Sequence, residues 1–298
     1  MPSQYIIGSS TLTNIADAIR LKGGTSSPMA PSEMPDLIDA IPSGGGTEIE
    51  DALIQRKLSG SYENSRVTDI SLYTFYNTSL ISVSFANVSV IDYSAFQYCD
   101  NLTTVYFPKA TIVRSSAFAY CTNLESAVFP MVTMIGRYAF AYCDNLSMAD
   151  LPLVSEIEVM AFQSCSMLSS VNIPAATRLW SQAFKSCRRL KYVSTPEVTY
   201  VDNQAFCACY NLSMISLPKV IYIGPNAFQN CYGLFSLYLM GSTIPALAFS
   251  TVFYSTPINS VYGESIGSYG SIFVPASLFE SYKTASNWSY YSSRFVSI

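Results

Sequence analysis

The chain has 298 residues, of which half are hydrophobic but only 12% are charged, and its formal net charge is −4. Typical soluble domains carry about 25% charged residues, so we expect a long apolar core under a surface of Ser, Thr, Asn and Tyr. The mild negative charge argues against nucleic-acid binding through phosphate neutralisation. Histidine is absent, which excludes Ser-His-Asp and Cys-His nucleophile systems and histidine metal sites.

The first 42 residues predict a small helical module, in which Leu12, Ile15 and Ile19 make an apolar stripe at helical spacing. The first ten residues show no basic segment leading into an apolar stretch, so this sequence predicts no signal peptide. No apolar run reaches the 18 residues or so of a transmembrane helix, and we expect no membrane insertion.

Residues 43–61 predict a glycine-rich linker followed by a helix that caps the N-terminal end of the next segment. Thr47 and Glu50 have the spacing of a capping box at the start of that helix. Gly60 is placed to end it, since glycine readily adopts the left-handed conformation that follows a helix.

Residues 62–255 carry a repeat of 22 residues, which is regular over seven copies from Ser79 to Tyr232, with degenerate copies around Phe75 and Phe249. Three positions are constant. One holds the phenylalanine of an Ala-Phe pair: Phe96, Phe118, Phe140, Phe162, Phe184, Phe206 and Phe228. The others hold Leu80, Leu102, Leu124, Leu146, Leu168, Leu190, Leu212 and Leu234, and Cys99, Cys121, Cys143, Cys165, Cys187, Cys209 and Cys231.

A single copy is too small to bury its own apolar side chains, so neighbouring copies must stack and share one core. Within one copy, residues 102–107 alternate as in a short strand whose inward residues are apolar. Pro108 follows and, lacking a backbone N–H, closes the strand. The sequence therefore predicts a repeat solenoid: a right-handed, β-rich horseshoe or arc of 22-residue coils with helical caps.

Residues 256–298 predict the C-terminal cap, because a solenoid exposes apolar surface at its ends unless it is covered. Residues 272–274 read as a strand, and Pro275 stands near the start of a helix. Leu278, Phe279 and Tyr282 share the helix face that we expect to pack onto the array.

The repeat frame N-L-x-x-[VI]-x-[FL]-P, followed by I-G-x-x-A-F-x-x-C, resembles the BspA-like leucine-rich repeats of bacterial surface proteins over roughly residues 62–255. The resemblance implies the leucine-rich-repeat fold and a surface or secreted binding role, often that of an adhesin. Residues 1–42 resemble short N-terminal modules of phage and prophage tail-associated proteins, which implies a different role.

The cysteine column is best explained as small buried hydrophobic residues that fill a tight turn. The side chains of a straight column all point the same way, so they neither pair completely as disulfides nor surround a tetrahedral zinc ion. Cys207 lies outside this column, at a position that holds Gln, Ala or Lys in other copies. We expect Cys207 to be partly exposed and to be the most reactive thiol.

Outward strand residues are the candidate binding surface, on the concave side where such arrays often bind partners. The candidates here are Tyr106, Asp150, Asn172, Tyr192 and Tyr238. Tyrosine is a frequent interface anchor, although an array of this kind also presents such residues without any ligand.

A second candidate is a basic and aromatic cluster that departs from the repeat, formed by Arg178, Trp180, Lys185, Arg188, Arg189 and Lys191. Guanidinium and ammonium groups beside aromatic rings suit a carboxylated glycan or an acidic protein surface. A solvated loop edge explains the same residues and is the more common case.

These observations favour a non-enzymatic binding protein, secreted or on a bacterial surface, that recognises a host protein or glycan of unknown identity. The alternative is a phage tail-associated receptor-binding or structural protein in the virion. An enzyme is the weakest hypothesis, because no phosphate loop, paired carboxylates or metal constellation stands out. Asp150, Glu156 and Glu158 are the nearest to an acidic cluster, and a surface turn explains them. We expect no cofactor, no metal and no nucleic-acid partner, and the sequence does not indicate an oligomeric state.

Overall fold

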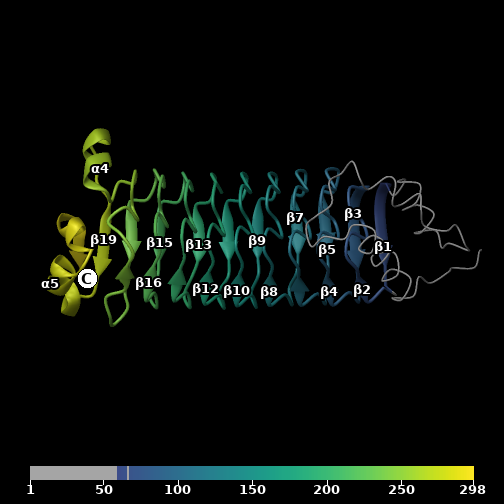
Figure 1. Cartoon of the computed structure of the whole chain (residues 1–298), viewed down its shortest axis with the longest axis horizontal. Helices are drawn as coiled ribbons and strands as arrows, with labels where there is room; N and C mark the ends of the chain where they lie inside the picture. Colours follow the sequence, from purple (N-terminus) through teal and green to yellow (C-terminus); the bar gives the residue numbers. More distant parts are fainter. Residues whose placement is uncertain (1–58, 66) are drawn as a thin grey trace, which may run out of the picture.

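The computed structural model describes residues 59–65 and 67–298, and the structural statements below concern these residues. They form a parallel β-solenoid whose coils stack along a nearly straight axis (Figure 1). The 22-residue leucine-rich-repeat solenoid predicted from the sequence is therefore confirmed. The predicted module at 1–42 and the predicted linker and capping helix up to residue 58 lie outside the described residues.

Each coil from β1 to β18 carries a longer strand on one side and a two-residue strand on the other, and β19 and β20 extend the row of longer strands. The longer strands are β1 (Ser59–Asn64), β3 (Ser79–Phe85), β5 (Thr104–Tyr106), β7 (Ser126–Val128), β9 (Met148–Asp150), β11 (Ser170–Asn172), β13 (Tyr192–Ser194), β15 (Met214–Ser216), β17 (Ser236–Tyr238), β19 (Ser271–Val274) and β20 (Phe295–Ser297). The two-residue strands are β2 (Asp69–Ile70), β4 (Val90–Ile91), β6 (Ile112–Val113), β8 (Met134–Ile135), β10 (Glu156–Ile157), β12 (Arg178–Leu179), β14 (Tyr200–Val201), β16 (Tyr222–Ile223) and β18 (Ala246–Leu247). We call the two outer surfaces the long-strand face and the short-strand face.

The alternation of side chains within each longer strand explains its position. In β5, Val105 is buried while Thr104 and Tyr106 on either side of it point outward, as a period of two requires. β5 pairs in parallel with β3 and β7 in a register that places equivalent repeat positions side by side. Each sequence position therefore becomes a column that runs along the solenoid.

The Ala-Phe turn is held by bonds between coils although its backbone is not extended. Two residues of each such turn have positive φ, for example Ser116 at 58° and Tyr120 at 63°, a conformation that is uncommon outside glycine. The N–H groups of Ser116, Phe118 and Tyr120 each donate to a carbonyl of the next coil, at 2.8 Å. The turn is thus a third ladder, and its hydrogen bonds offset the cost of the left-handed residues.

Phenylalanine forms the centre of the core. The Ala-Phe column is continuous, with neighbouring rings stacked at 4.9 to 5.6 Å from Phe75 to Phe253. A second column, followed by proline in six of its eight coils, changes along the chain: Phe85, Phe107, Phe129, Leu151, Ile173, Thr195, Leu217 and Leu239. Offset and edge contacts join the two columns where both hold rings, as between Phe107 and Phe118 at 6.1 Å.

The N-terminal boundary of the array differs from the prediction at Gly60. This glycine lies inside strand β1 rather than at the end of a helix, and the strand already starts at Ser59. Gly60 has a φ of 85°, and the pairing of β1 with β3 shifts register between Gly60 and Ser61. The pairing skips Ile81, so the extra residue of the bulge lies in β3 opposite Gly60, whose positive φ suits glycine because it has no Cβ.

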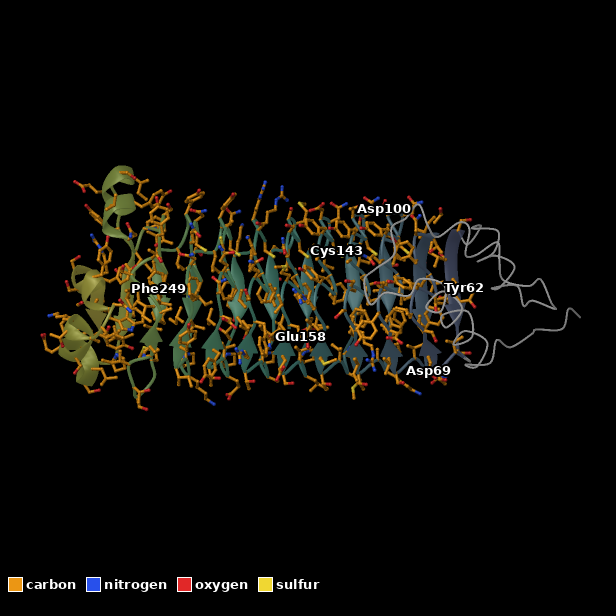
Figure 2. The ribbon with its side chains drawn as sticks, viewed as in Figure 1. Tyr62, Asp69, Asp100, Cys143, Glu158 and Phe249 are labelled. Atoms are coloured by element: carbon orange, nitrogen blue, oxygen red, sulfur yellow. The ribbon has the colours of Figure 1, made fainter. Side chains whose placement is uncertain are left out.

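The C-terminal degenerate copy is also displaced from its predicted place. Phe249, expected to continue the phenylalanine column, is 57% exposed (Figure 2). Phe253 takes that place instead, fully buried and stacked on Phe228 at 5.5 Å. The Phe228 N–H donates to the Val252 carbonyl at 3.1 Å, so Val252-Phe253 replaces the Ala-Phe pair after a short insertion.

The C-terminal end combines α4 (Ser260–Ile266), η1 (Ala276–Leu278), α5 (Phe279–Thr284) and η2 (Ser289–Arg294) with strands β19 and β20. α4 projects to one side of the stack (Figure 1). Tyr282, Trp288 and Tyr291 are buried against the last coil, and the Trp288 indole N–H donates to the Pro245 carbonyl at 2.8 Å. Leu278 and Phe279 pack against the core, as the sequence predicts.

Candidate functional site: the long-strand face

The outward residues of the long-strand face are mostly small and polar, but large apolar side chains interrupt them. Tyr106 is 48% exposed and Tyr192 is 54% exposed, on β5 and β13. Met148 and Met214 open β9 and β15 and are also exposed. Exposed Val128 lies on β7 beside Tyr106 in the ladder. The face therefore exposes several large apolar side chains to solvent.

The other predicted residues of this face are already engaged with neighbours. Asn172 donates through its side-chain amide to the Asp150 carboxylate at 2.8 Å across β9 and β11. Tyr238 is half-buried and stacks on Phe273 at 4.4 Å between ring centroids. Tyr106 and Tyr192 remain the open aromatic residues among the five candidates.

The predicted basic and aromatic cluster is divided among three parts of the coil. Arg178 lies in β12 on the short-strand face, where its guanidinium stacks over Trp180 at 3.7 Å and pairs with the Asp202 carboxylate at 3.2 Å. Lys185 lies in the Ala-Phe turn and donates to the Gln204 amide oxygen at 3.1 Å. The cations Arg178 and Lys185 are therefore engaged by neighbours within the solenoid, although Arg178 Nε and Trp180 Nε1 are buried without a hydrogen-bond partner in the described part of the chain.

The remaining cations of that cluster lie where the chain enters β13. Arg188, Arg189 and Lys191 are all exposed. The Arg188 guanidinium lies 5.6 Å from the Tyr210 ring centroid. Lys191 directly precedes Tyr192, the first residue of β13. This group therefore borders the long-strand face, whereas Arg178 and Lys185 do not.

The long-strand ladder is interrupted at two places in the described chain. The strands divide into β1-β3-β5-β7, β9-β11-β13 and β15-β17-β19-β20, whereas the short strands form one nine-stranded sheet from β2 to β18. The breaks therefore lie between β7 and β9 and between β13 and β15. An exposed methionine, Met148 or Met214, opens the strand that follows each break.

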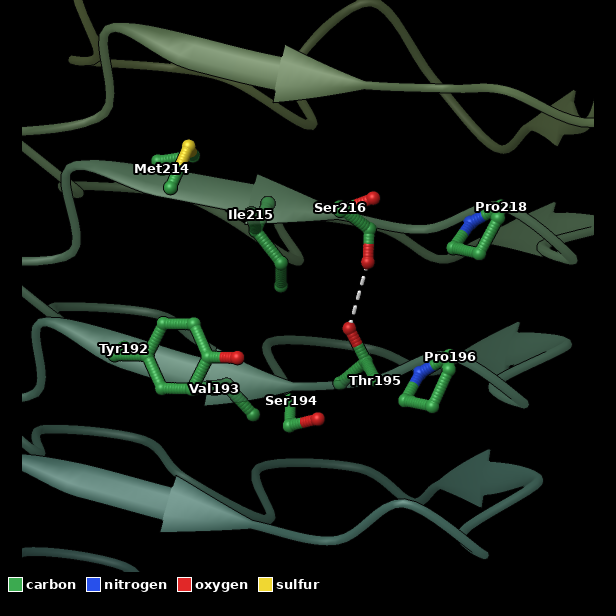
Figure 3. Close-up of a pocket in the computed structure, with 9 residues that line it drawn as sticks. All are labelled: Tyr192, Val193, Ser194, Thr195, Pro196, Met214, Ile215, Ser216 and Pro218. Carbon is green, nitrogen blue, oxygen red and sulfur yellow. Dashed lines mark hydrogen bonds between the residues drawn. The ribbon is translucent and has the colours of Figure 1, made fainter.

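A groove of about 180 Å³ lies at the second break, between β13 and β15 (Figure 3). Tyr192 and Met214 lie at one end of it and Pro196 and Pro218 at the other. Its floor includes Thr195, which stands where other coils place a Phe, Leu or Ile. The Thr195 hydroxyl donates to the Ser216 carbonyl at 2.8 Å, which holds the two coils together by a side chain.

Sequence reasoning missed this groove, although one signal for it was present. Thr195 is the single polar residue in the column that precedes the repeat proline between Phe85 and Leu239. A buried polar group requires a hydrogen-bond partner, and a backbone carbonyl of the next coil is the nearest kind available. The departure therefore pointed to an altered contact between these two coils.

The cysteines are buried, as predicted for the column, and each column thiol also makes a hydrogen bond. The seven Sγ atoms donate to the carbonyl of the phenylalanine one coil earlier, at 2.9 to 3.1 Å. Burial raises the pKa of Cys165 and Cys209 well above the ordinary thiol value. These thiols therefore stay protonated and unreactive at neutral pH.

The predicted exposure of Cys207 is wrong. Cys207 is only 6% exposed, and its Sγ lies 3.9 Å from the Gln229 amide oxygen. Burial raises the pKa of this thiol, and Lys185 opposes the rise only in part. The longer side chains at the same position in other coils are not exposed either, since Gln97 is buried and Gln163, Lys185 and Gln229 are half-buried.

No cluster of three or more metal-ligating side chains occurs within residues 59–65 and 67–298. Asp150 and Glu158, which the sequence grouped as acidic, belong to different parts of the coil. Glu158 accepts a hydrogen bond from the Arg137 backbone N–H at 2.9 Å, while Asp150 is bonded to Asn172. In the same part of the chain, no helix has both the length and the apolar character needed to cross a membrane.

Comparison with known proteins gives a family match over most of the array. The family described as BspA type leucine rich repeat region matches residues 61–147 and 155–269 in six copies. No curated protein matches the chain.

Several solved structures resemble the solenoid. A leucine-rich repeat protein of T. pallidum is 31% identical, with a TM-score of 0.48, and the match covers 51% of this chain and 77% of that one. A leucine rich cell surface protein of Faecalibacterium prausnitzii is 32% identical, with a TM-score of 0.45, over 60% of this chain and 45% of that one. A leucine-rich repeat protein of Bacteroides ovatus is 16% identical, with a TM-score of 0.33, over 82% of this chain and 85% of that one.

Proposed function

Because the chain belongs to the BspA type leucine-rich repeat family, we propose that it is a non-enzymatic protein that binds a partner through its long-strand face. The partner is a protein or a glycan outside the cell, and the chain acts at the cell surface or in secreted form. The location rests on the family resemblance of the repeat, and the choice of face rests on the exposed side chains of the long strands.

One observation carries the choice of face. Tyr106, Val128, Met148, Tyr192 and Met214 are exposed on strands whose other outward residues are mostly Ser, Thr and Asn. Contiguous exposed apolar side chains with a polar border mark interaction surfaces, and Tyr106 with Val128, like Tyr192 with Met214, lie on neighbouring strands. Tyrosine adds a large contact area at low cost in side-chain entropy.

The test is a screen of the purified chain on arrays of host extracellular proteins and glycans. A face variant combines Tyr106→Ala, Met148→Ala, Tyr192→Ala and Met214→Ala. A matched control variant combines Met131→Ala, Leu153→Ala and Ile221→Ala, which are similarly exposed but lie outside the long strands. Circular dichroism and melting temperature establish that both variants fold.

We expect the face variant to lose binding by at least tenfold and the control variant to bind as the unmodified chain does. Equal binding by all three proteins would contradict the choice of face. Binding only to intact bacterial cells, with no host protein or glycan recognised, would favour the tail-associated receptor-binding role that residues 1–42 resemble.

A further inference from the structure

The groove between β13 and β15 differs chemically from the rest of the long-strand face. The ladder is open there, so the strands are joined by the Thr195 hydroxyl rather than by regular strand pairing. The groove is bordered by Tyr192, Met214, Pro196 and Pro218 (Figure 3). A volume of about 180 Å³ gives room for one large side chain.

The lining suits an apolar side chain better than a sugar. The lining residues supply methionine, proline, tyrosine and aliphatic carbon with a few hydroxyl groups, and none of them carries a carboxylate, carboxamide or cationic side chain. Ligand pockets that are mainly apolar with a few polar groups fit an apolar group and orient it through those polar groups. A monosaccharide would need more hydrogen-bonding side chains than this groove offers.

A positively charged border lies next to the groove. Arg188, Arg189 and Lys191 are exposed just before β13, and none of the three forms an ion pair within the described part of the chain. At the opposite end, Lys219 is neutralised by Glu197 at 2.5 Å. The whole chain has a net charge of −4, so this border is a local excess of the opposite sign.

We propose that this groove docks an acidic protein segment. A large apolar side chain of the partner enters between Tyr192, Met214 and the two prolines. An Asp or Glu close to it in the partner sequence contacts Lys191 and Arg189, since a carboxylate matches both cations in charge and the guanidinium in geometry. The proposal rests on the proposed function and names the class of partner.

The experiment uses the full chain and random peptides displayed on phage as the probe. We expect selection to enrich peptides in which Asp or Glu lies within a few residues of Leu, Ile, Met, Phe or Trp. One enriched peptide is then synthesised, and its affinity for the full chain and for four variants is measured by isothermal titration calorimetry.

Two variants test the charged border. Arg189→Glu with Lys191→Glu should weaken binding of the peptide by at least tenfold. Lys109→Glu with Arg137→Glu reverses the same number of exposed cations in coils away from the groove and should change affinity less than threefold. A similar loss in both variants would show that only net charge matters and would overturn the proposal.

Two further variants test the groove itself. Ser216→Trp places a large ring at a residue that lines the groove, and binding should be lost. Ser84→Trp makes the same change at the equivalent position of β3, where the ladder to β5 is unbroken, and binding should persist. The melting temperature of each variant shows whether it folds.

The outcomes separate this inference from the proposed function. If no acidic peptide is enriched, or if only carboxylated glycans bind, the inference fails. If a host protein binds the unmodified chain and is lost in the face variant, but the Arg189→Glu and Lys191→Glu change has no effect, the proposed function stands without this inference. If that host protein binds the face variant as tightly as the unmodified chain, the proposed binding role of the long-strand face is wrong, whatever the result for the groove.

Discussion

The two strand-bearing sides of the solenoid are built from the same repeat, yet they differ in continuity. On the short-strand side, one sheet runs without interruption from β2 to β18, and the Ala-Phe turn adds a continuous stack of rings and thiols. On the long-strand side, the ladder is broken twice. The side with the breaks presents the exposed Tyr106, Met148, Tyr192 and Met214, while the short-strand side also presents an exposed tyrosine, Tyr200 of β14.

This difference indicates a division of roles within the cross-section of each coil. The turn and the short strand keep nearly invariant Ala, Phe and Cys columns, so they supply stability in every coil. The long strand is free to vary, because its pairing can be lost at β13 and β15 while the other ladders hold the coils together. Variation that creates a groove is therefore tolerated there.

Alkaline pH should affect the continuous side most strongly. Burial raises the pKa of the column thiols Cys121, Cys143, Cys165, Cys187, Cys209 and Cys231 in the folded chain. Thiols of the unfolded chain ionise near pH 8.5, whereas those of the folded chain stay protonated to higher pH. The contribution of each buried thiol to the free energy of unfolding is therefore complete below pH 8.5 and is lost as pH rises through the folded pKa. In this pH range, each thiol should raise the equilibrium constant for unfolding roughly tenfold per pH unit.

Denaturant titrations at pH 7.5, 9 and 10 under reducing conditions measure this dependence. Cys165→Ala should make the free energy of unfolding depend less steeply on pH, by the contribution of one thiol. A midpoint that stays constant from pH 7.5 to 10 would show that the column does not resist ionisation.

Removing one ring from the phenylalanine column should produce the next largest effect. Phe162 is buried and stacks between Phe140 at 5.2 Å and Phe184 at 5.4 Å. Phe162→Ala removes apolar burial and leaves a cavity, at a cost of about 3–5 kcal/mol in the free energy of unfolding. A loss below about 1 kcal/mol, measured by chemical denaturation, would contradict the assignment of stability to this side.

Removing the Thr195 hydroxyl, which bridges the break between β13 and β15, should have a smaller effect on stability. Thr195→Val keeps the side-chain shape but removes the donor to the Ser216 carbonyl, so unfolding should become easier by about 1 kcal/mol. Thr199→Val is the control, since Thr199 makes a similar bond to the Thr177 carbonyl at 2.9 Å but is more exposed to water. An equal loss of unfolding free energy in both variants would show that the bond between β13 and β15 contributes no more than an ordinary threonine bond between coils.

The smallest effect on stability should come from the proposed binding surface. Tyr192→Ala removes a ring that is more than half exposed, so the free energy of unfolding should change by less than about 0.5 kcal/mol. The same variant should weaken partner binding, which is measured on the array that identifies the partner. A large loss of stability would mean that Tyr192 belongs to the core and not to the proposed binding surface.

The 22-residue period of the sequence predicted most of the fold, because apolar residues that recur at the same position of every copy are buried only when the copies stack. The Leu, Phe and Cys columns named from the sequence are all buried in the solenoid. Prediction failed where the period failed. The insertion before Phe253 is fixed by contacts with the C-terminal cap, such as the Asn287 amide bonded to the Leu247 carbonyl at 2.7 Å.

The candidate site was less predictable, because contacts between coils determine which polar side chains are available. Arg178 reads as a free cation in sequence, yet Asp202, which neutralises it, lies in the next coil. Cys207 reads as exposed beside Gln and Lys at equivalent positions, although Ala119 and Ala141 at the same position are 1% exposed. The exposed Tyr106 and Tyr192 followed directly from the alternation of the strands.

The thiol bonds of the turn have a consequence for how such an array changes in length. Each column cysteine from Cys121 onward reaches the carbonyl of a phenylalanine that lies 25 residues earlier, at the same offset in every coil. Deletion or duplication of a 22-residue unit in the gene would recreate that offset at the new junction, whatever the unit's starting point. Length can thus evolve by recombination without any compensating substitution in the interior, while the outward residues of the long strands diverge separately.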